Sequence, residues 1–269
     1  MLRIRTRLVG WVLGHLCPYV PPYHYKTHLP HFAYIIMECG YDQAYQGEYI
    51  MSYTIQTITT SYFGAGVNCY LIQTDKGFIL IDTGGVKGRE QVEKAMIEAG
   101  CTPQNVLLIA LTHGHFDHCD NARYFQKRFG GKIALHADDS DMVKRGNMFL
   151  QRRFITQAFL NGVMWLMGVR HFDKFTPDII LKEGDTLREY GLDATVHHLP
   201  GHSRGSVGFL TSDGDYFAGD VFTNLKGKPQ MNSLIENKAD LIASVEKVKT
   251  SGAKRVYVGH GEPFALPMV

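Results

Sequence analysis

Short apolar runs separated by turn residues recur from about residue 53 to the end of the chain. Runs of this kind, rich in β-branched and aromatic side chains, are typical of strands. They occupy residues 53–59, 67–73, 78–81, 106–111, 133–135, 179–181, 194–198, 207–210, 215–218 and 255–258. We predict a strand at each of them, with turns at residues 64–66 and 75–77.

Apolar positions repeat at helical spacing in residues 90–99, 121–129 and 239–249. The first two stretches end at glycines, which commonly follow the last turn of a helix. Residues 138–170 predict an insertion of one or two helices, with aromatic and methionine side chains among polar ones. Strands and helices therefore come as two roughly repeated halves, interrupted once.

The first fifty residues do not share this pattern. Residues 1–7 are basic and residues 8–20 are apolar, which are features of a secretory signal. The apolar stretch is too short to span a bilayer and no small-residue cleavage site follows it. We predict a non-catalytic extension at residues 1–50 and one domain at residues 51–269, with Met37 and Met51 as alternative starts.

Composition limits the class of protein. With 269 residues, of which 45% are apolar and 20% charged, the chain can bury a full core as one large domain. A net charge of +2 without a basic tract gives no sign of nucleic-acid binding. The five cysteines form no CxxC pair, so free thiols in the cytoplasm are expected, although the N-terminus does not exclude secretion. We expect no stable membrane anchor and leave a homo-oligomer open.

A cluster of candidate metal ligands lies directly after the apolar run at residues 106–111. His113, His115, Asp117 and His118 form the pattern H-x-H-x-D-H. Neutral imidazole and carboxylate are ligands of zinc, manganese and iron. Since side chains alternate along an extended segment, the first two histidines point to the same side, and the other two residues can serve a second metal beside the first.

Three more candidate ligands follow strand-like runs, each beside a glycine that lets the backbone approach closely: His202, Asp220 and His260. The set divides into two sites that share one carboxylate. One would hold His113, His115, His202 and Asp220, and the other Asp117, His118, His260 and Asp220. Taken singly, each later histidine could be a hydrogen-bonded structural residue, and Asp220 a turn residue. The cluster at 113–118 favours the metal interpretation for all of them.

This ordered set resembles the metallo-β-lactamase superfamily, and the resemblance covers most of the chain from about residue 51. Residues 79–84 (Ile-Leu-Ile-Asp-Thr-Gly) match its first motif, and residues 113–118, His202, Asp220 and His260 match the others. The resemblance implies an α+β fold, a four-layer αββα sandwich with a dinuclear site at one edge. It also implies that Asp82 supports a ligand and does not bind metal itself.

The chemistry implied is hydrolysis. Two divalent ions, with zinc expected first and manganese or iron as alternatives, lower the pKa of water so that hydroxide exists at neutral pH. We expect a hydroxide that bridges them to attack a carbonyl or phosphorus, with Asp117 as the catalytic residue that orients it and moves its proton.

The substrate is expected to be a small molecule: an ester, thioester or lactone with an apolar portion. A carboxylate at Asp220 resembles the thioesterase, lactonase and phosphodiesterase branches, and the chain ends nine residues after His260 without the helical domain of the glyoxalase II pattern. Phe116, Phe154 and Phe222 are our working assignments for the pocket. The alternatives are a β-lactamase or phosphodiesterase on the same site, an iron redox protein, and a binding module without catalysis.

Overall fold

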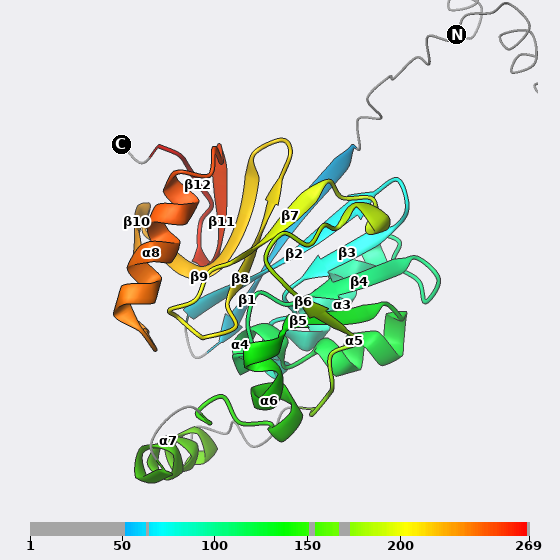
Figure 1. Cartoon of the computed structure of the whole chain (residues 1–269). Coiled ribbons are helices and arrows are strands. Elements are labelled where there is room, and N and C mark those ends of the chain that lie inside the picture. The colour runs from blue at the N-terminus through cyan, green and yellow to red at the C-terminus, as the bar shows by residue number, and fades with distance from the viewer. Residues whose placement is uncertain (1–51, 63–64, 151–153, 167–172, 268–269) are drawn as a thin grey trace, which may run out of the picture. The chain divides into compact units, whose positions relative to one another are not determined.

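The computed structural model describes residues 52–62, 65–150, 154–166 and 173–267 (Figure 1). The extension predicted at residues 1–50 lies outside the described residues, so its boundary stays a prediction. In the described part, the chain forms two six-stranded sheets with helices on their outer faces.

The first sheet follows the order of the chain. Its strands are β1 (Tyr53–Tyr62), β2 (Ala65–Thr74), β3 (Phe78–Ile81), β4 (Val106–Ala110), β5 (Lys132–His136) and β6 (Ile179–Leu181). β1, β2 and β3 pair antiparallel, whereas β3 to β6 pair parallel. Parallel pairs need long crossover connections, and the helices of the first half lie in these connections.

The second sheet has the order β12-β11-β9-β8-β7, and β10 pairs with β9. Its strands are β7 (Ala194–His198), β8 (Val207–Thr211), β9 (Asp215–Leu225), β10 (Lys228–Met231), β11 (Arg255–Gly261) and β12 (Phe264–Ala265). β9 and β11 pair parallel, with register shifts on both sides of Val258.

The described helices are α3 (Arg89–Glu98), α4 (Phe116–Cys119), α5 (Ala122–Phe129), α6 (Ala137–Arg145), α7 (Phe154–Leu166) and α8 (Lys238–Lys249), with short 3-10 turns η1 (Val86–Gly88) and η2 (Arg188–Tyr190). The helices predicted from spacing are confirmed as α3, α5 and α8. α8 begins where it does because the Asn237 side chain accepts hydrogen bonds from the N–H groups of Ala239 and Asp240. No helix within the described ranges is long and apolar enough to cross a bilayer.

Three buried clusters define the layers. The first joins α3 and α5 to one face of the first sheet and includes Met96 and Phe125. The second lies between the sheets around Phe209 and Phe217. The third joins α8, through Leu241, to the outer face of the second sheet. These clusters and the arrangement in Figure 1 confirm the expected four-layer αββα sandwich.

One boundary differs from the prediction in a way that matters. The run at 215–218 was expected to end before Asp220, because Gly219 and Asp220 are typical turn residues. Instead β9 continues to Leu225, since Val221 and Phe222 are buried and the strand pairs with β10 and β11. Asp220 therefore projects from the middle of a strand, directly after Gly219 with its φ of 52°.

Candidate metal centre

Asp82, directly after the end of β3, supports two of the predicted ligands. Its φ of 56° lies in the left-handed region, which residues other than glycine adopt only where surrounding contacts hold the backbone. Its buried carboxylate accepts hydrogen bonds from the N–H and hydroxyl of Thr112, at 2.8 and 2.7 Å, and from Nδ1 of His118 at 2.8 Å. Since Nδ1 of His118 donates to a carboxylate, its Nε2 carries the free lone pair.

The same carboxylate also orients His113 through Thr112. The Thr112 hydroxyl gives its one proton to Asp82, so its oxygen accepts from Nδ1 of His113, 3.1 Å away. Nε2 of His113 is then the atom with the lone pair. Asp82 thus acts on two imidazoles, as carboxylates behind metal-binding histidines commonly do.

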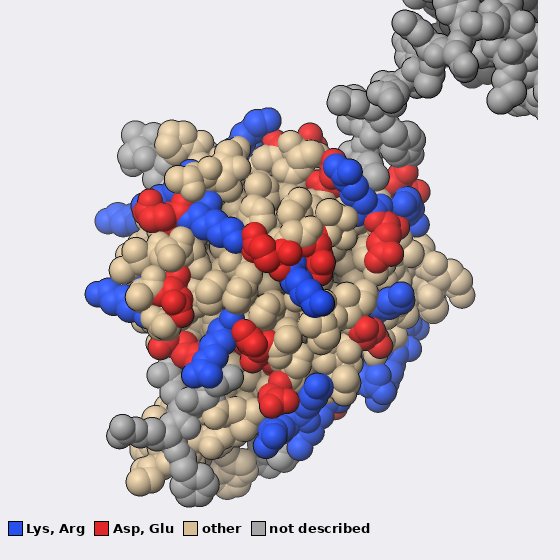
Figure 2. Space-filling view, viewed as in Figure 1, with Lys and Arg blue, Asp and Glu red and all other residues tan. Residues whose placement is uncertain are grey.

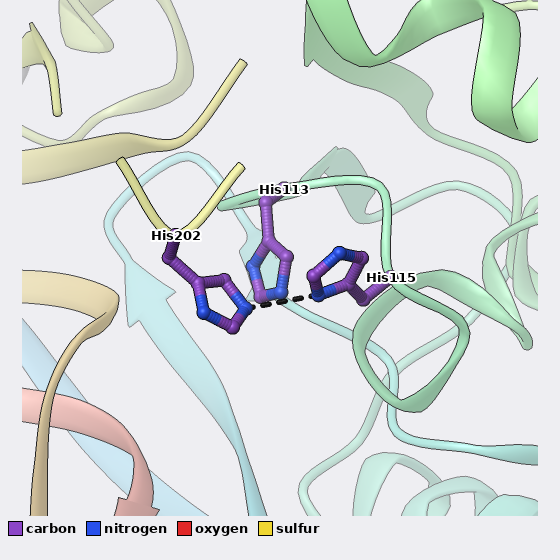
Figure 3. A group of neighbouring side chains, drawn as sticks. All are labelled: His113, His115 and His202. Carbon is purple, nitrogen blue, oxygen red and sulfur yellow. Dashed lines mark hydrogen bonds between the residues drawn. The ribbon is translucent and has the colours of Figure 1, made fainter. Parts of the chain in front are cut away.

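His113, His115 and His202 form the first group (Figure 3), with one ring nitrogen of each within 4.8 Å of the others. His202 comes from the loop after β7, where its Nδ1 donates to the carbonyl of Leu234 at 2.7 Å. Its Nε2 faces Nδ1 of His115 at 2.9 Å, the contact drawn in Figure 3. A carbonyl therefore fixes the His202 tautomer that leaves a lone pair facing the group.

Asp117, His118 and His260 form a second group with the same spacing limit of 4.8 Å. His260 lies on β11, and its Nδ1 donates to the carbonyl of Gly66 at 2.8 Å. Its Nε2 is 3.5 Å from Oδ2 of Asp117. Again a carbonyl holds the imidazole with one nitrogen directed at its neighbours.

Asp220 lies between the two groups. Its Oδ1 is 3.5 Å from Nε2 of His118, and its Oδ2 is 3.4 Å from Nε2 of His202 and 3.3 Å from Nε2 of His260. Gly259 permits this approach, because a Cβ there would collide with Oδ1 of Asp220 and stand 2.6 Å from Cε1 of His118. The structure thus brings all seven predicted ligands together around one carboxylate.

Several polar atoms in these groups are buried with no hydrogen-bond partner in the described part of the chain: Nε2 of His113, Nε2 of His118 and Oδ1 of Asp220. Burial without a partner is costly for such atoms. All three face the other ligand atoms and offer lone pairs to a cation. This observation, with a donor set of imidazoles and carboxylates, fits divalent metal ions.

Electrostatics differ between the two groups. Burial lowers the pKa of His113, which the neighbouring His118 lowers further, and burial lowers the pKa of His115 to about 3. Burial also acts to lower the pKa of His118 and His260, but the carboxylates led by Asp220 outweigh it and raise these pKa values to about 9 and about 11. His113 and His115 are therefore neutral imidazoles at neutral pH. In the second group, the nearby carboxylates favour positive charge on His118 and His260, and a bound cation would satisfy the same carboxylates.

A cavity of about 490 Å³ opens onto both groups. Part of its lining is ligand side chains, and another part is apolar: Phe116, Met142, Met148, Phe149, Leu234 and Ile235. Phe116 is thus at the predicted pocket. Phe222 instead lies in the core, 1% exposed and against Phe264, because β9 continues past Asp220 and turns this side chain inward. The side chain of Phe154 is outside the described part of the structure.

One supporting residue was missed by sequence reasoning. Asp139, in the first turn of α6, is fully buried and accepts hydrogen bonds from Gly114 N–H at 2.8 Å, Ser203 Oγ at 2.7 Å and Gly205 N–H at 2.8 Å. It joins the segment that holds His113 and His115 to the loop that holds His202. Acidic residues are ordinary in a first helical turn, so the sequence contains no signal for this role.

Comparison with known proteins places these observations in context. The family model described as "Metallo-beta-lactamase superfamily" matches residues 63–260. The bovine (Bos taurus) acyl-coenzyme A thioesterase MBLAC2 is 29% identical over 174 residues, covering 59% of each chain. Hydroxyacylglutathione hydrolase GloC of Haemophilus influenzae is 31% identical over 159 residues, covering 57% of this chain and 66% of GloC. The matches thus span less than two thirds of either relative. The structure of TTHA1623 in a di-iron-bound form superposes with a TM-score of 0.58 at 25% identity, covering 77% of this chain and 94% of that one.

Proposed function

The chain belongs to the metallo-beta-lactamase superfamily, and we propose that it is a metal-dependent hydrolase of small acyl thioesters. The observation that carries the proposal is the convergence of seven imidazole and carboxylate side chains, three of whose atoms are buried and unpartnered, at a cavity with an apolar wall. The names of two relatives support the substrate class: one is an acyl-coenzyme A thioesterase, the other a hydroxyacylglutathione hydrolase.

We assign the ligands as the sequence predicted them. His113, His115 and His202 would hold one ion, and Asp117, His118 and His260 the other, with Asp220 between them. Two divalent ions, when bound, lower the pKa of water and withdraw charge from a substrate oxygen. Zinc remains our first expectation, and the di-iron form of TTHA1623 supports iron as an alternative.

The residues of the chain supply orientation, proton transfer and an apolar wall for the substrate. Asp117 is about one-fifth exposed at the cavity wall, so its free oxygen can accept the proton of an attacking water and deliver it to the leaving thiolate. Asp82 and the carbonyls of Gly66 and Leu234 keep the imidazoles in the tautomers that face the site. The apolar wall formed by Phe116, Phe149 and their neighbours would hold an acyl chain.

We further propose a reducing compartment, the cytoplasm. Cys69, Cys101 and Cys119 are buried free thiols, which supports this location. The oligomeric state stays a prediction.

The test combines metal content with a substrate panel. Full-length protein loaded with Zn²⁺, Mn²⁺ or Fe²⁺ is assayed on short and long acyl-coenzyme A, a hydroxyacylglutathione, an acyl homoserine lactone, a chromogenic β-lactam and an aryl phosphodiester. We expect two ions per chain and the highest kcat/KM on a thioester. A preference for the lactone, β-lactam or phosphodiester would refute the substrate class while leaving the hydrolase intact.

Variants separate the chemistry from the fold. His115→Ala should abolish hydrolysis and leave the fold mostly intact, and Asp117→Asn should lower kcat more than it raises KM. His197→Gln is the matched control, because His197 contacts Tyr216 outside both groups. Activity that survives His115→Ala on every substrate would rule out the proposed site.

A further inference from the structure

Helix α7 presents an apolar stripe to solvent. Ile155, Phe159 and Leu166 are 82%, 68% and 78% exposed. They stand at spacings of four and seven residues, with Gly162 between the last two, so they share one side of the helix. Trp165 is also 57% exposed.

The opposite side of α7 is less exposed, although it is not more apolar. Gln157 and Leu160 are half-buried there. Surface helices normally turn their apolar side inward and their polar side to water. In α7 the polar Gln157 is half-buried, whereas the apolar stripe faces the solvent. Figure 1 shows α7 beyond α6, away from both sheets. An outward stripe of large apolar side chains is typical of a surface that another apolar phase covers.

The segment of the chain between Asp141 and Asp173 carries positive charge only. Residues 142–172 contain no Asp or Glu, and they contain Lys144, Arg145, Arg152, Arg153 and Arg170. Lys144 also lines a surface cavity of about 350 Å³ with Arg123 and Lys174. In Figure 2, Lys and Arg side chains are visible along the lower edge of the molecule, with Asp and Glu side chains beside some of them. α7 itself has no charged residue.

We infer that α7 binds reversibly to an anionic lipid surface. The stripe of Ile155, Phe159 and Leu166 would enter the boundary of the acyl chains, while the exposed side chains of Lys144 and Arg145 contact acidic headgroups. The 13 residues of α7 span only about 20 Å, so the helix lies in the interface and does not cross it. This agrees with the absence of a stable anchor expected from the sequence, and it goes beyond the proposed hydrolase function, on which it does not depend.

Charge also selects a lipid surface over a second copy of the chain. A two-fold symmetric contact through α7 would bring two identical basic segments together. Five cations without an acidic residue would repel five more, whereas anionic headgroups neutralise them. The lipid surface therefore satisfies the stripe and the charge together.

The experiment is co-sedimentation of the full-length protein with vesicles. One set is phosphatidylcholine alone and the other is equal parts phosphatidylcholine and phosphatidylglycerol. We expect binding to the anionic vesicles that weakens at high salt, and little binding to the neutral ones. The Trp11→Phe variant, in which Trp165 is the remaining tryptophan, should show a blue-shifted emission with anionic vesicles.

The decisive variant is Ile155→Ser/Phe159→Ser/Leu166→Ser, compared with Ala158→Ser, an exposed substitution beside the stripe. Each buried apolar side chain contributes about a tenfold factor in affinity, so the triple variant should bind about a thousandfold more weakly. The substituted side chains are exposed, so thermal unfolding should match the wild type. If the triple variant unfolds early, Phe159→Ser alone is used and should lose about tenfold.

Two results would overturn the inference. Equal binding of the wild type and the stripe variant would assign any lipid affinity to another segment, such as residues 1–50. Wild-type protein that ignores anionic vesicles, yet forms a dimer that the stripe variant does not form, would assign the stripe to self-association.

Discussion

Removing the carboxylate of Asp139 tests the link between the two ligand-bearing loops. Asp139→Ala leaves the N–H groups of Gly114 and Gly205 buried without their acceptor. The Ser203 hydroxyl loses less, because Ser206 Oγ is 2.8 Å away and can replace the lost partner. The damage is therefore confined to two backbone donors, of which Gly114 is adjacent to His113 and His115 and Gly205 lies three residues after His202.

The magnitude follows from those two donors. Each buried donor left unpaired costs about 1–3 kcal/mol, so the free energy of unfolding should fall by about 2–6 kcal/mol. We expect the lower half of that range, about 3 kcal/mol, since a small cavity left by the carboxylate admits water. For a domain of this size that corresponds to a fall in Tm of about 6–12 °C.

Asp139→Ala should also lower the affinity for metal, and more for one of the two ions than for the other. Gly114 separates His113 from His115, and Gly205 lies three residues after His202, so the first ligand group loses its support. Outer supports of metal ligands are worth about 10–100-fold in affinity. We expect a loss of that size for one ion per chain, measured by competition with a chromogenic chelator, and a smaller loss for the other.

Asp141→Ala is the matched control, because Asp141 is an exposed carboxylate on the same helix. It should change the free energy of unfolding by less than about 0.5 kcal/mol. If Asp139→Ala unfolds like this control and retains both ions with unchanged affinity, Asp139 does not support the site.

Three further predictions concern other contacts. Asp82→Ala should weaken metal binding about 10–100-fold, because both His118 and, through Thr112, His113 lose the acceptor that sets their tautomer; unchanged chelator competition would contradict this. Gly259→Ala should reduce kcat/KM by about 100-fold or more, because its methyl group collides with Asp220 and His118. Gly162→Ala is the control, because its methyl group meets nothing within 4 Å, and it should stabilise α7 by about 1 kcal/mol. Equal losses of activity in the two variants would count against the close approach at Gly259. Burial raises the pKa of Cys101 to about 12. The stabilisation from its neutral thiol is therefore complete below the ordinary thiol pKa of about 8.5 and is lost as the pH rises toward 12. In urea unfolding, the free energy of unfolding should fall less between pH 7 and pH 10 in Cys101→Ala than in the wild type.

Local pattern was sufficient for most elements and for the candidate ligands. Apolar runs and helical spacing predicted strands and helices because burial on one or both faces leaves a period in the chain. The cluster at residues 113–118 was recognisable because four ligand types stand within six positions. His202, Asp220 and His260 were found because each follows an apolar run beside a glycine.

Local pattern was insufficient wherever a partner lies far along the chain. The carbonyl of Gly66 that orients His260 is 194 positions away, and His202 meets His115 across 87 positions. Asp139 gains its role only because α6 packs against two loops at once. No period in the sequence records such meetings, since they depend on how the sheets and loops pack.

The sequence by itself determined which side chains this protein brings to one edge of a sandwich, because strand ends and glycines are encoded locally. Only the tertiary structure decided that β9 runs on through Asp220, turning Phe222 into the core, and that the stripe of α7 points outward. Both outcomes depend on what surrounds a residue in space. Pairing with β10 and β11 extends β9, and the stripe of α7 is exposed because no element in the described structure covers it.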